Sequence, residues 1–326
     1  MLLDIQHTSD IIGGKKMKGL NTTDFSDFGT KITGKVRDIY DLRDKLIFIT
    51  TDRQSAFDRF ITLIPGKGLL LNMASVWWFG KTADIVPNHL ISNPHANVVV
   101  GKKLTIFPVE FVIRGFNTGT TNTSVWTAYE KGVREFGGNI LPDGMTKHQQ
   151  FEKPIITPTT KSDIHDKNIT PAEIVKEGLM TQEQFDRCAE YAFKLFQRGN
   201  DLVKERGLIL VDTKYEFGYD DDGKIYLADE IHTPDSSRWW ISKTYSDNVT
   251  SGKDPDCIDK DILRRYVKTK CDPYKDEIPE IPKEIISEMQ QKYSELFTMI
   301  TGISIMDEEF DKCTAENIHE VLKEKY

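Results

Sequence analysis

The sequence has few cysteines, no long apolar run and no surplus of positive charge. Its 326 residues include four cysteines, which are scattered without a Cys-x-x-Cys pair, so neither a disulfide scaffold nor a zinc finger is expected. The most apolar uncharged run, residues 68–80, is too short to span a bilayer. The first ten residues lack the basic start and apolar stretch of a secretory signal. We therefore expect a soluble cytoplasmic protein with reduced cysteines and no membrane partner.

The overall charge is acidic. Lys and Arg number 43 against 51 Asp and Glu, which gives a formal net charge of −8. Because a nucleic-acid binder needs an excess of cations, we expect no nucleic-acid partner, although a local Arg and Lys cluster can still hold a small anion. A hydrophobic fraction of 38%, with 10% aromatic residues, is enough for a sizeable core and excludes wholesale disorder.

Hydrophobic periodicity indicates an α+β protein with antiparallel sheets, packed helices and two lobes. Residues 1–30 are weakly patterned and are expected to form a loose lead-in. Residues 31–116 contain strand patterns that include a hairpin at 35–50, and a buried helix is expected at 67–83. We expect this part to form a β-rich lobe. The remainder, residues 117–326, is expected to form a second α+β lobe with a cleft between the two.

Helix signals dominate the second half of the chain. Thr170 followed by Pro171 and Glu173 is typical of a capped helix start, and Thr181 with Gln184 repeats the pattern before a longer helix. Further helices are expected at about 258–269 and 283–301. Their regular apolar stripes indicate faces that pack into the core.

The most informative polar pattern lies in residues 208–238. A buried-strand run passes into an alternating stretch that puts Asp212, Lys214 and Glu216 on one face. An Asp-Gly pair predicts a two-residue turn, and the register that follows from it places Glu216 opposite Asp229. Opposed carboxylates repel each other unless a cation lies between them. Both acids are therefore candidate ligands of Mg²⁺, which prefers oxygen donors and often carries nucleotide phosphates.

A solvated acidic hairpin is the alternative to a metal site, with Lys214 reducing the repulsion. Edge hairpins are often charged, and a different turn would shift the register by one residue. Beyond the hairpin, the loop from His232 to Arg238 supplies hydroxyls and a guanidinium, which suit an anion.

Gly34-Lys35-Val36-Arg37 opens the first predicted hairpin. A glycine lets a backbone approach a ligand closely, and Lys35 and Arg37 are expected to share one strand face. The pattern suits contact with nucleotide phosphates. Alternating cations on an exposed strand also occur for solvation alone, so both interpretations stay open.

A second pattern for anion binding begins at Arg114, at the end of a predicted strand. The arginine runs into residues 115–121, which are rich in glycine and hydroxyls, and a helical segment begins after Ser124. Backbone N–H groups at a helix start, small hydroxyls and one guanidinium together suit a phosphate monoester. A capped polar turn is an equally good interpretation of the same residues.

Three other polar loops are less specific. Residues 161–166 mix both charges around His165, and a histidine in such a loop is more often structural or solvated than catalytic. Residues 52–58 are rich in side chains that bond to backbone turns and predict a well-tied loop. Residues 65–68, Pro-Gly-Lys-Gly, suit either an anion cradle or the start of the buried helix.

Taken together, these motifs resemble the SAICAR synthetase family. The matching segments occur in the family's order over about residues 30–245, and their joint occurrence is highly specific. They are GKVRDIYDL at 34–42, TDRQSAFDR at 51–59, PGKG at 65–68, PVEFVIRGFNTGT at 108–120, KSDIHD at 161–166, LILVDTKYEFG at 208–218 and ADEIHTPDSSRWW at 228–240.

The resemblance implies a two-lobed fold related to ATP-grasp enzymes and kinases, with ATP in the cleft between the lobes. It implies ATP-dependent ligation of L-aspartate to 5-amino-1-(5-phosphoribosyl)imidazole-4-carboxylate (CAIR). The products would be SAICAR, ADP and phosphate, formed in de novo purine biosynthesis through an acyl phosphate. ATP and Mg²⁺ are the implied cofactors, and ATP, CAIR and L-aspartate are the implied small-molecule partners of a monomer or homodimer.

The same resemblance implies roles for individual residues. Lys214, Asp212 and Arg114 would be catalytic. ATP would be bound by Gly34, Lys35, Val36, Arg37 and Lys214. CAIR would be bound by Arg114, Thr120, Asp212 and Arg238. Aspartate would be bound by Lys161 and Asp166, and the metal by Glu216 and Asp229.

Two other functions fit parts of the pattern. One is a small-molecule kinase with the same lobes, which would release ADP without needing an amine substrate. The other is a regulatory protein that binds nucleotides without turnover, and steady ADP production would exclude it.

Overall fold

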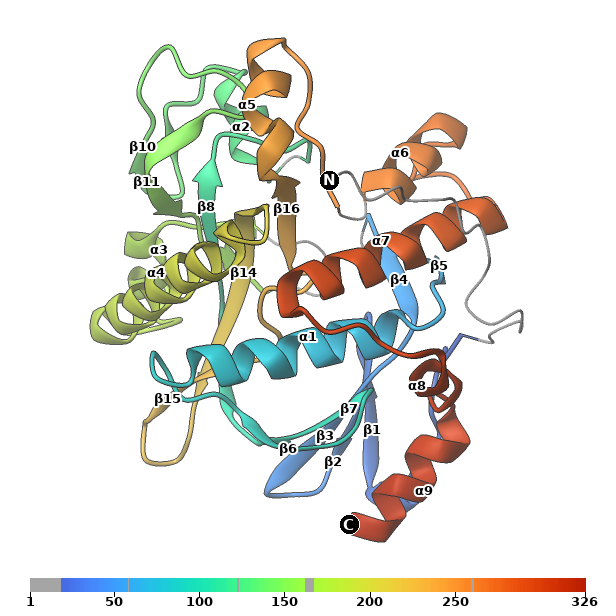
Figure 1. Ribbon diagram of the computed structural model, residues 1–326. Helices are drawn as coiled ribbons and strands as arrows, with labels where there is room; N and C mark the ends of the chain where they lie inside the picture. The colour runs from blue at the N-terminus through green and yellow to red at the C-terminus, as the bar shows by residue number, and fades with distance from the viewer. Residues whose placement is uncertain (1–18, 58, 122, 162–166, 259–260) are drawn as a thin grey trace.

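The computed structural model describes residues 19–57, 59–121, 123–161, 167–258 and 261–326, and it shows an α+β fold built on two larger antiparallel sheets (Figure 1). The α+β prediction is confirmed. Within these residues no helix is both long enough and apolar enough to cross a membrane.

The first sheet has five strands in the order β1-β2-β3-β7-β6, and every neighbouring pair is antiparallel. The hairpin expected at 35–50 is confirmed as β2 and β3, with Arg37 opposite Thr50. β2 is also paired with an earlier strand, β1, which the sequence pattern did not predict. The strands are β1 (Thr30–Thr33), β2 (Arg37–Asp41), β3 (Lys45–Thr50), β6 (Leu90–His95) and β7 (Val98–Lys102).

The second sheet has seven strands and centres on the long strand β14 (Leu208–Tyr219). β8 (Thr105–Phe116) pairs with one edge of β14, and β16 and β15 pair in succession with its other edge. The other strands of this sheet are β11 (Gln150–Ile156), β12 (Thr159–Thr160), β13 (Lys167–Asn168), β15 (Ile225–Ala228) and β16 (Ser237–Ile241). Two small sheets are made of β4 (Arg53–Ala56) with β5 (Arg59–Leu63) and β9 (Glu135–Phe136) with β10 (Asn139–Ile140).

Two predicted helix starts are confirmed in detail. Thr170 and Glu173 form a capping box at the start of α3 (Pro171–Lys176). Thr181 and Gln184 form another at the start of α4 (Gln182–Lys204). Each box satisfies backbone N–H groups that have no partner in the first helical turn.

α4 covers one face of the second sheet (Figure 1). Its apolar stripe, including Phe185 and Ala192, packs into a core with Phe111 of β8 and with Tyr215 and Phe217 of β14. This packing leaves the opposite face of β14 for the polar side chains that alternate with the buried ones.

The helix α1 (Lys67–Thr82) is buried as predicted and lies between the first sheet and α7 (Lys283–Thr301), as Figure 1 shows. α7 confirms the helix expected at 283–301. The remaining helical elements are η2 (Ser26–Phe28), α2 (Val125–Tyr129), α5 (Ser242–Thr250), α6 (Asp261–Lys270), α8 (Asp307–Asp311) and α9 (Ala315–Lys325).

The two large sheets and the helices that pack on them do not divide the chain in sequence order. β8 was expected in the first lobe but belongs to the second sheet, whereas Ile318 and Leu322 of α9 pack into the core of the first sheet with Tyr40. We therefore propose that the chain passes between lobes just before β8, not at residue 116, and that its C-terminal helices return to the first lobe.

The described end of the predicted lead-in is well packed. Leu20, Phe25 and Phe28 are buried in the core of the first sheet. The N–H of Leu20 donates to Oδ2 of Asp52, whose Oδ1 accepts from the N–H of Gly68 at 2.8 Å. Asp52 thus ties three segments together, in agreement with the prediction of a well-tied loop.

A buried ion pair joins the start of α1 to the loop before β16. Lys67 is fully buried, and its Nζ lies 2.6 Å from Oδ2 of Asp235 and 2.8 Å from the carbonyl oxygen of Arg53. The hydroxyl of Tyr293, on α7, lies 3.0 Å from Oδ1 of the same aspartate. Of the two predictions for residues 65–68, the structure therefore supports the start of the buried helix.

We expect Lys67→Met to lower the free energy of unfolding by about 3–5 kcal/mol, because it leaves the Asp235 carboxylate buried without its cation. The double variant Lys67→Met/Asp235→Asn should recover part of this loss, since no unpaired charge is left. Urea denaturation of both variants measures the difference. Equal losses of unfolding free energy in the single and double variants would show that the unpaired charge of Asp235 is not the cause of the loss.

Candidate active site

The predicted alternation along β14 is confirmed. Tyr215 and Phe217 are buried in the core under α4, and Lys214 and Glu216 lie on the opposite face. Asp212 shares that face and lies directly between Arg114 of β8 and Arg238 of β16 in the strand register. The face therefore carries two groups of charged side chains on one rigid strand, with Asp212 and Glu216 about 13 Å apart along it.

The predicted register of the hairpin is wrong by one residue. Glu216 pairs with Ala228, and Asp229 lies just beyond β15 with a positive φ of 62°. Glu216 and Asp229 are therefore not opposed across the hairpin as expected.

The turn explains this shift. The N–H of Gly223 donates to the carbonyl of Asp220 at 2.8 Å, and the N–H of Asp220 donates to the carbonyl of Lys224, which closes a loop of three residues. Oδ1 of Asp220 also accepts from the backbone N–H groups of Asp222 and Lys224. Gly223 has a φ of 76°, as the last position of such a loop requires. The side chain of Asp220 thus favours a three-residue loop over the two-residue turn.

The carboxylate that does face Glu216 is Glu110 of β8. Nζ of Lys214 lies between them, 2.5 Å from Oε1 of Glu110 and 2.8 Å from Oε1 of Glu216. Lys161 pairs with the other oxygen of Glu216. Two opposed acids therefore do have a cation between them, but the pair is Glu110 and Glu216 and the cation is Lys214.

Glu110 was not among the predicted site residues, although the sequence contains a signal for it. Glu110 and Arg114 are four residues apart in a predicted strand, so they must share a face. Thr159 of β12 also donates to Glu110 at 2.9 Å. An acid with apolar neighbours on both sides, Val109 and Phe111, is a feature of this strand that could have identified it.

Arg37 connects the first sheet to the end of the β15 hairpin. Its Nη1 lies 2.5 Å from Oδ1 of Asp229, and its Nη2 lies 2.9 Å from Oε2 of Glu230. Oε2 of Glu230 also accepts from the hydroxyl of Thr233. Glu230 is a second residue that the sequence analysis missed. We call the charged group formed by Arg37, Glu110, Lys161, Lys214, Glu216, Asp229 and Glu230 the ion-pair cluster.

Burial and charge oppose each other in this cluster. Burial lowers the pKa of Arg37, but the carboxylates of Asp229 and Glu230 outweigh it and raise the pKa overall. Burial likewise acts to lower the pKa of Lys214, and the neighbouring Glu216 and Glu110 reverse the effect. Both cations therefore stay charged near neutral pH.

The segment that precedes Arg37 differs from the prediction. Gly34, Lys35 and Val36 form the turn between β1 and β2, so Lys35 does not share a strand face with Arg37. Arg53 holds this turn, because its guanidinium donates to the carbonyls of Gly34 at 3.0 Å and Lys35 at 3.3 Å. The turn lies at the same end of β2 as Arg37.

Arg114, Asp212 and Arg238 form the second charged group. Oδ2 of Asp212 lies 3.6 Å from Nη1 of Arg114 and 3.5 Å from Nη1 of Arg238. Burial lowers the pKa of Arg114, Asp212 raises it, and the like charge of Arg238 lowers it further. With two guanidinium groups around one carboxylate, this group has one excess positive charge and suits an anion.

Arg114 is also fixed by the loop that follows β8. Its Nε donates to the hydroxyl of Thr157 at 2.8 Å, and its Nη2 donates to the carbonyl of Thr123 at 3.2 Å. Thr120 lies in this loop and is exposed. Asp166, predicted to bind aspartate, falls outside the described residues.

The donor set of the ion-pair cluster fits a divalent metal. Glu216 is buried, Asp229 is partly buried, and both present carboxylate oxygens, the donors that Mg²⁺ prefers. Among the described residues no group of three or more acids, histidines or cysteines has the arrangement of a complete metal site. The residues that could hold such a metal are therefore Glu216 and Asp229, each of which is now paired with a cation.

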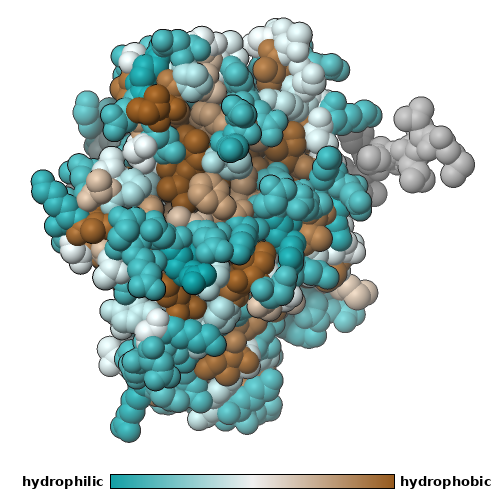
Figure 2. Space-filling view, turned by 90° about the vertical axis from the view of Figure 1, so that its left-hand side faces the viewer, coloured by the Kyte–Doolittle hydropathy of each residue, from teal (hydrophilic) through white to brown (hydrophobic). Residues whose placement is uncertain are grey.

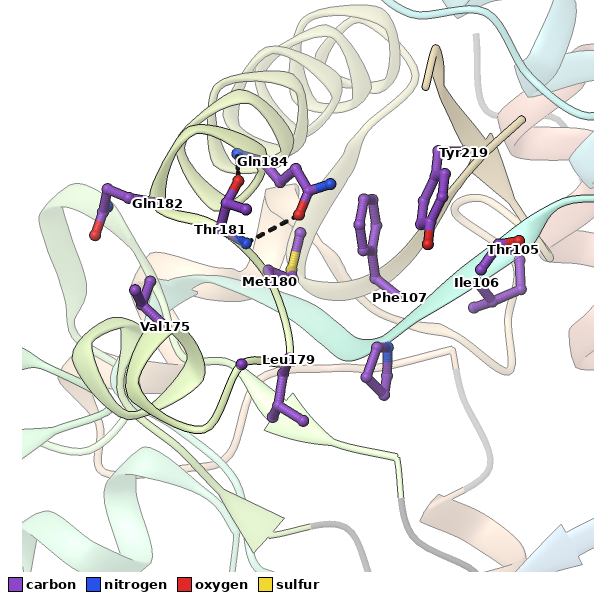
Figure 3. A pocket seen from close by; sticks show the side chains of 12 residues that line it. Thr105, Ile106, Phe107, Val175, Leu179, Met180, Thr181, Gln182, Gln184 and Tyr219 are labelled. Atoms are coloured by element: carbon purple, nitrogen blue, oxygen red, sulfur yellow. Dashed lines mark hydrogen bonds between the residues drawn. The ribbon is translucent and has the colours of Figure 1, made fainter. Parts of the chain in front are cut away.

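A cavity of about 550 Å³ lies elsewhere, beside the turn between α3 and α4 (Figure 3). Phe107 and Tyr219 stand next to each other at one side of it, and Thr181 and Gln184 of the capping box lie at the other. None of the predicted site residues lines this cavity. Figure 2 shows the molecular face that carries α3 and α4, on which separate hydrophobic patches are surrounded by hydrophilic side chains.

Comparisons with known proteins agree on one family. The sequence profile of the SAICAR synthetase family matches residues 30–281. Phosphoribosylaminoimidazole-succinocarboxamide synthase of Legionella pneumophila is 56% identical over 280 residues, which cover 86% of this chain and 90% of that protein. The chloroplastic enzyme of Arabidopsis thaliana is 51% identical over 277 residues, which cover 85% of this chain and 67% of that protein.

Solved structures give the same result. SAICAR synthase from Saccharomyces cerevisiae, complexed with SAICAR, has a TM-score of 0.76 and 32% identity, covering 88% of this chain and 99% of that one. A type-2 SAICAR synthetase in complex with ADP has a TM-score of 0.65 and 26% identity, and the match covers 85% of this chain and 99% of that one.

These likenesses define the class of protein: the chain is an enzyme, a carbon–nitrogen ligase of purine biosynthesis. It belongs to the SAICAR synthetase family. The family resemblance of the motifs is thereby confirmed.

Proposed function

We propose that the polar face of the second sheet is the catalytic site at which this chain joins L-aspartate to CAIR with consumption of ATP. The observation that carries this proposal is the arrangement along β14. A group with excess positive charge around Asp212 lies on the same face as a cluster of paired acids and cations around Glu216. The first suits the ribotide phosphate and the second suits a nucleotide with its metal.

The chemistry requires activation of a poor electrophile. A carboxylate resists attack by an amine because its charge and resonance lower the reactivity of its carbon. We propose that a carboxylate oxygen of CAIR attacks the γ-phosphorus of ATP, so that the bond from that phosphorus to the bridging oxygen breaks and ADP leaves. The aspartate amine then attacks the carbon of the acyl phosphate, loses a proton, and phosphate leaves with the former carboxylate oxygen.

The reaction brings two anions together, so charge neutralisation and positioning are the main catalytic contributions. Lys214 and Arg37 would contact the transferred and leaving phosphates, and each is now paired with carboxylates of the ion-pair cluster. Mg²⁺ held by Glu216 and Asp229 would neutralise phosphate charge. Gly34, Lys35 and Val36 would contact ATP through their turn, beside Arg37.

The remaining roles are proposed from the family resemblance, and the positions of the charged side chains support them. Arg114, Arg238 and Thr120 would hold the ribotide phosphate, and Asp212, between the two arginines, would accept a hydrogen bond from the imidazole amine. Lys161 is exposed beside Glu216 and would attract the carboxylates of aspartate. ATP, CAIR and L-aspartate would be the small-molecule partners, and a cytoplasmic location fits the four free cysteines.

An assay that omits one component at a time tests this function. Steady ADP release is expected only when ATP, CAIR, Mg²⁺ and L-aspartate are all present, because without aspartate the reaction stops at the acyl phosphate after one turnover. CAIR labelled with ¹⁸O in its carboxylate should transfer one labelled oxygen to the released phosphate, which mass spectrometry detects. ADP release that is independent of aspartate would instead indicate a kinase, and unlabelled phosphate would exclude the acyl phosphate.

A further inference from the structure

A threonine, a histidine and an aspartate from three separate segments form a continuous hydrogen-bonded chain. Oγ1 of Thr118 lies 2.8 Å from Nδ1 of His148, and Nε2 of the same ring lies 2.8 Å from Oδ1 of Asp254. Thr118 is 2% exposed and His148 is 8% exposed, whereas the Asp254 side chain is at the surface. The mechanism proposed above uses none of these three residues.

The partners determine which ring nitrogen carries hydrogen. The carboxylate of Asp254 can only accept, so Nε2 of His148 must donate to it. Nδ1 of the neutral ring is then an acceptor, and the hydroxyl of Thr118 donates to it. Both hydrogen bonds therefore run in the same direction: Thr118 donates to His148, and His148 donates to Asp254, which fixes the ring.

The backbone of His148 is fixed as well. Its N–H donates to the carbonyl of Asn117 at 2.7 Å, and its carbonyl accepts from the hydroxyl of Tyr245 at 2.8 Å. Its φ is 67°, in the left-handed region. A residue held in an uncommon backbone conformation by bonds on both sides has a defined position.

Thr118 belongs to the loop that follows β8 and holds Arg114. The N–H of Asn117 donates to the carbonyl of Gln149, so this loop runs beside the segment of His148. A few residues further on, the carbonyl of Thr123 accepts from Arg114. Displacement of Thr118 would therefore shift a segment that contacts the guanidinium assigned to the ribotide phosphate.

We propose that His148 is a positioning residue for the ribotide phosphate. Its ring fixes the hydroxyl of Thr118, and Asp254 fixes the ring of His148. The inference rests on the proposed function, since it assigns the phosphate to this loop. It predicts an effect on CAIR binding and none on the nucleotide site.

The ring's charge gives the arrangement a pH dependence. The titratable groups facing it are Lys147 on its own segment, Asp254 on the loop before α6, and Arg238 on β16; the other neighbours, Trp240 and Tyr245, are uncharged near neutral pH. Burial lowers the pKa of His148 below 6.5, Asp254 opposes this, and the two cations add to it. The ring is therefore neutral at pH 7.

Protonation of the His148 ring reverses the direction of the hydrogen bond between Nδ1 and Thr118. The ring then donates to the hydroxyl of Thr118, whose own hydrogen becomes available to an anion, and a positive charge is added near Arg238. Both changes favour a phosphate. The ratio of the CAIR affinity of the native chain to that of a variant without the imidazole should therefore grow as the pH falls towards the lowered pKa of His148. The titration of the ribotide itself cancels in this ratio.

The test compares His148→Asn with Lys147→Gln. Asparagine tolerates a positive φ, so the first variant keeps the backbone but cannot bridge Thr118 and Asp254. Lys147→Gln removes the other partner of Asp254, Nζ of Lys147 at 2.7 Å, and leaves the hydrogen bonds from Thr118 to His148 and from His148 to Asp254 intact. We expect His148→Asn to raise the KM for CAIR about tenfold at pH 7.5, the usual size for loss of a buried hydrogen bond. The kcat and the KM values for ATP and aspartate should stay within about twofold, as should every parameter of Lys147→Gln.

The ratio of the KM for CAIR in His148→Asn to that in the native chain should rise further between pH 7.5 and 5.5. An unchanged KM for CAIR, or an equal rise in the KM for ATP, would overturn the proposal. Asp254→Ala, a change at the surface that removes the acceptor of Nε2, provides a second variant if His148→Asn does not fold. It should raise the KM for CAIR about threefold, and no rise would also overturn the proposal. A native chain that releases no ADP with all substrates would instead contradict the proposed function.

Discussion

Glu216→Gln is expected to reduce kcat by more than about 100-fold while the chain stays folded. Glutamine has the shape of glutamate but no charge, so Lys214 and Lys161 would each lose a carboxylate partner and the metal would lose an anionic ligand. Steady-state ADP release at saturating substrates measures the effect, and circular dichroism checks the fold. Asp229→Asn should behave in the same way, since its carboxylate is the other proposed ligand.

Asp221→Asn is the matched control for these two variants. It removes one acid from the tip of the same hairpin, where the side chain is exposed, and kcat should stay within about twofold. Raising the Mg²⁺ concentration should restore part of the activity of Glu216→Gln if the lost group is a metal ligand. Normal turnover of Glu216→Gln at ordinary Mg²⁺ would remove the metal assignment and leave a structural ion pair.

Arg114→Ala is expected to raise the KM for CAIR about 100-fold. The change removes a buried guanidinium that the loop after β8 and Thr157 hold in place, and truncating a buried charged partner of a ligand costs about 2–5 kcal/mol. The KM values for ATP and for aspartate should change little, because the ion-pair cluster lies further along β14. Steady-state kinetics with each substrate varied in turn give the three KM values separately.

Arg187→Ala, which changes an exposed arginine on α4, is the control for loss of an arginine as such, and its kinetic parameters should match those of the native chain. If Arg114→Ala lowered only the affinity for ATP, the phosphate assignment would be wrong. A loss of affinity for CAIR that Arg114→Lys fully restored would indicate that charge alone, without the two fixed donors of the guanidinium, is sufficient.

Local patterns determined much of the structure. The capping boxes at Thr170 and Thr181 follow from interactions within four residues, and the two helices begin where those patterns predict. The alternation that put Lys214 on one face of β14 and Tyr215 on the other is also local, because successive side chains of any strand point to opposite faces. The motifs themselves identified the family.

Other features depend on contacts between distant segments. The register of the β15 hairpin depended on the side chain of Asp220, which favours a longer loop, and a shift of one residue changes every opposed pair. The placement of β8 in the second sheet depended on its pairing with β14, about a hundred residues later in the chain. Propensity and periodicity carry no information about which strand becomes a neighbour.

The sequence by itself determined which residues carry charge, which face of β14 they occupy, and the family to which the chain belongs. Only the tertiary structure decided which side chains these charged and polar residues contact. It placed Glu110 opposite Glu216, brought Arg37 from the first sheet to Asp229 and Glu230, and joined His148 to Thr118. The physical reason is that a strand's own alternation is fixed by its backbone geometry, whereas strand pairing and loop closure depend on the free energy of the whole chain.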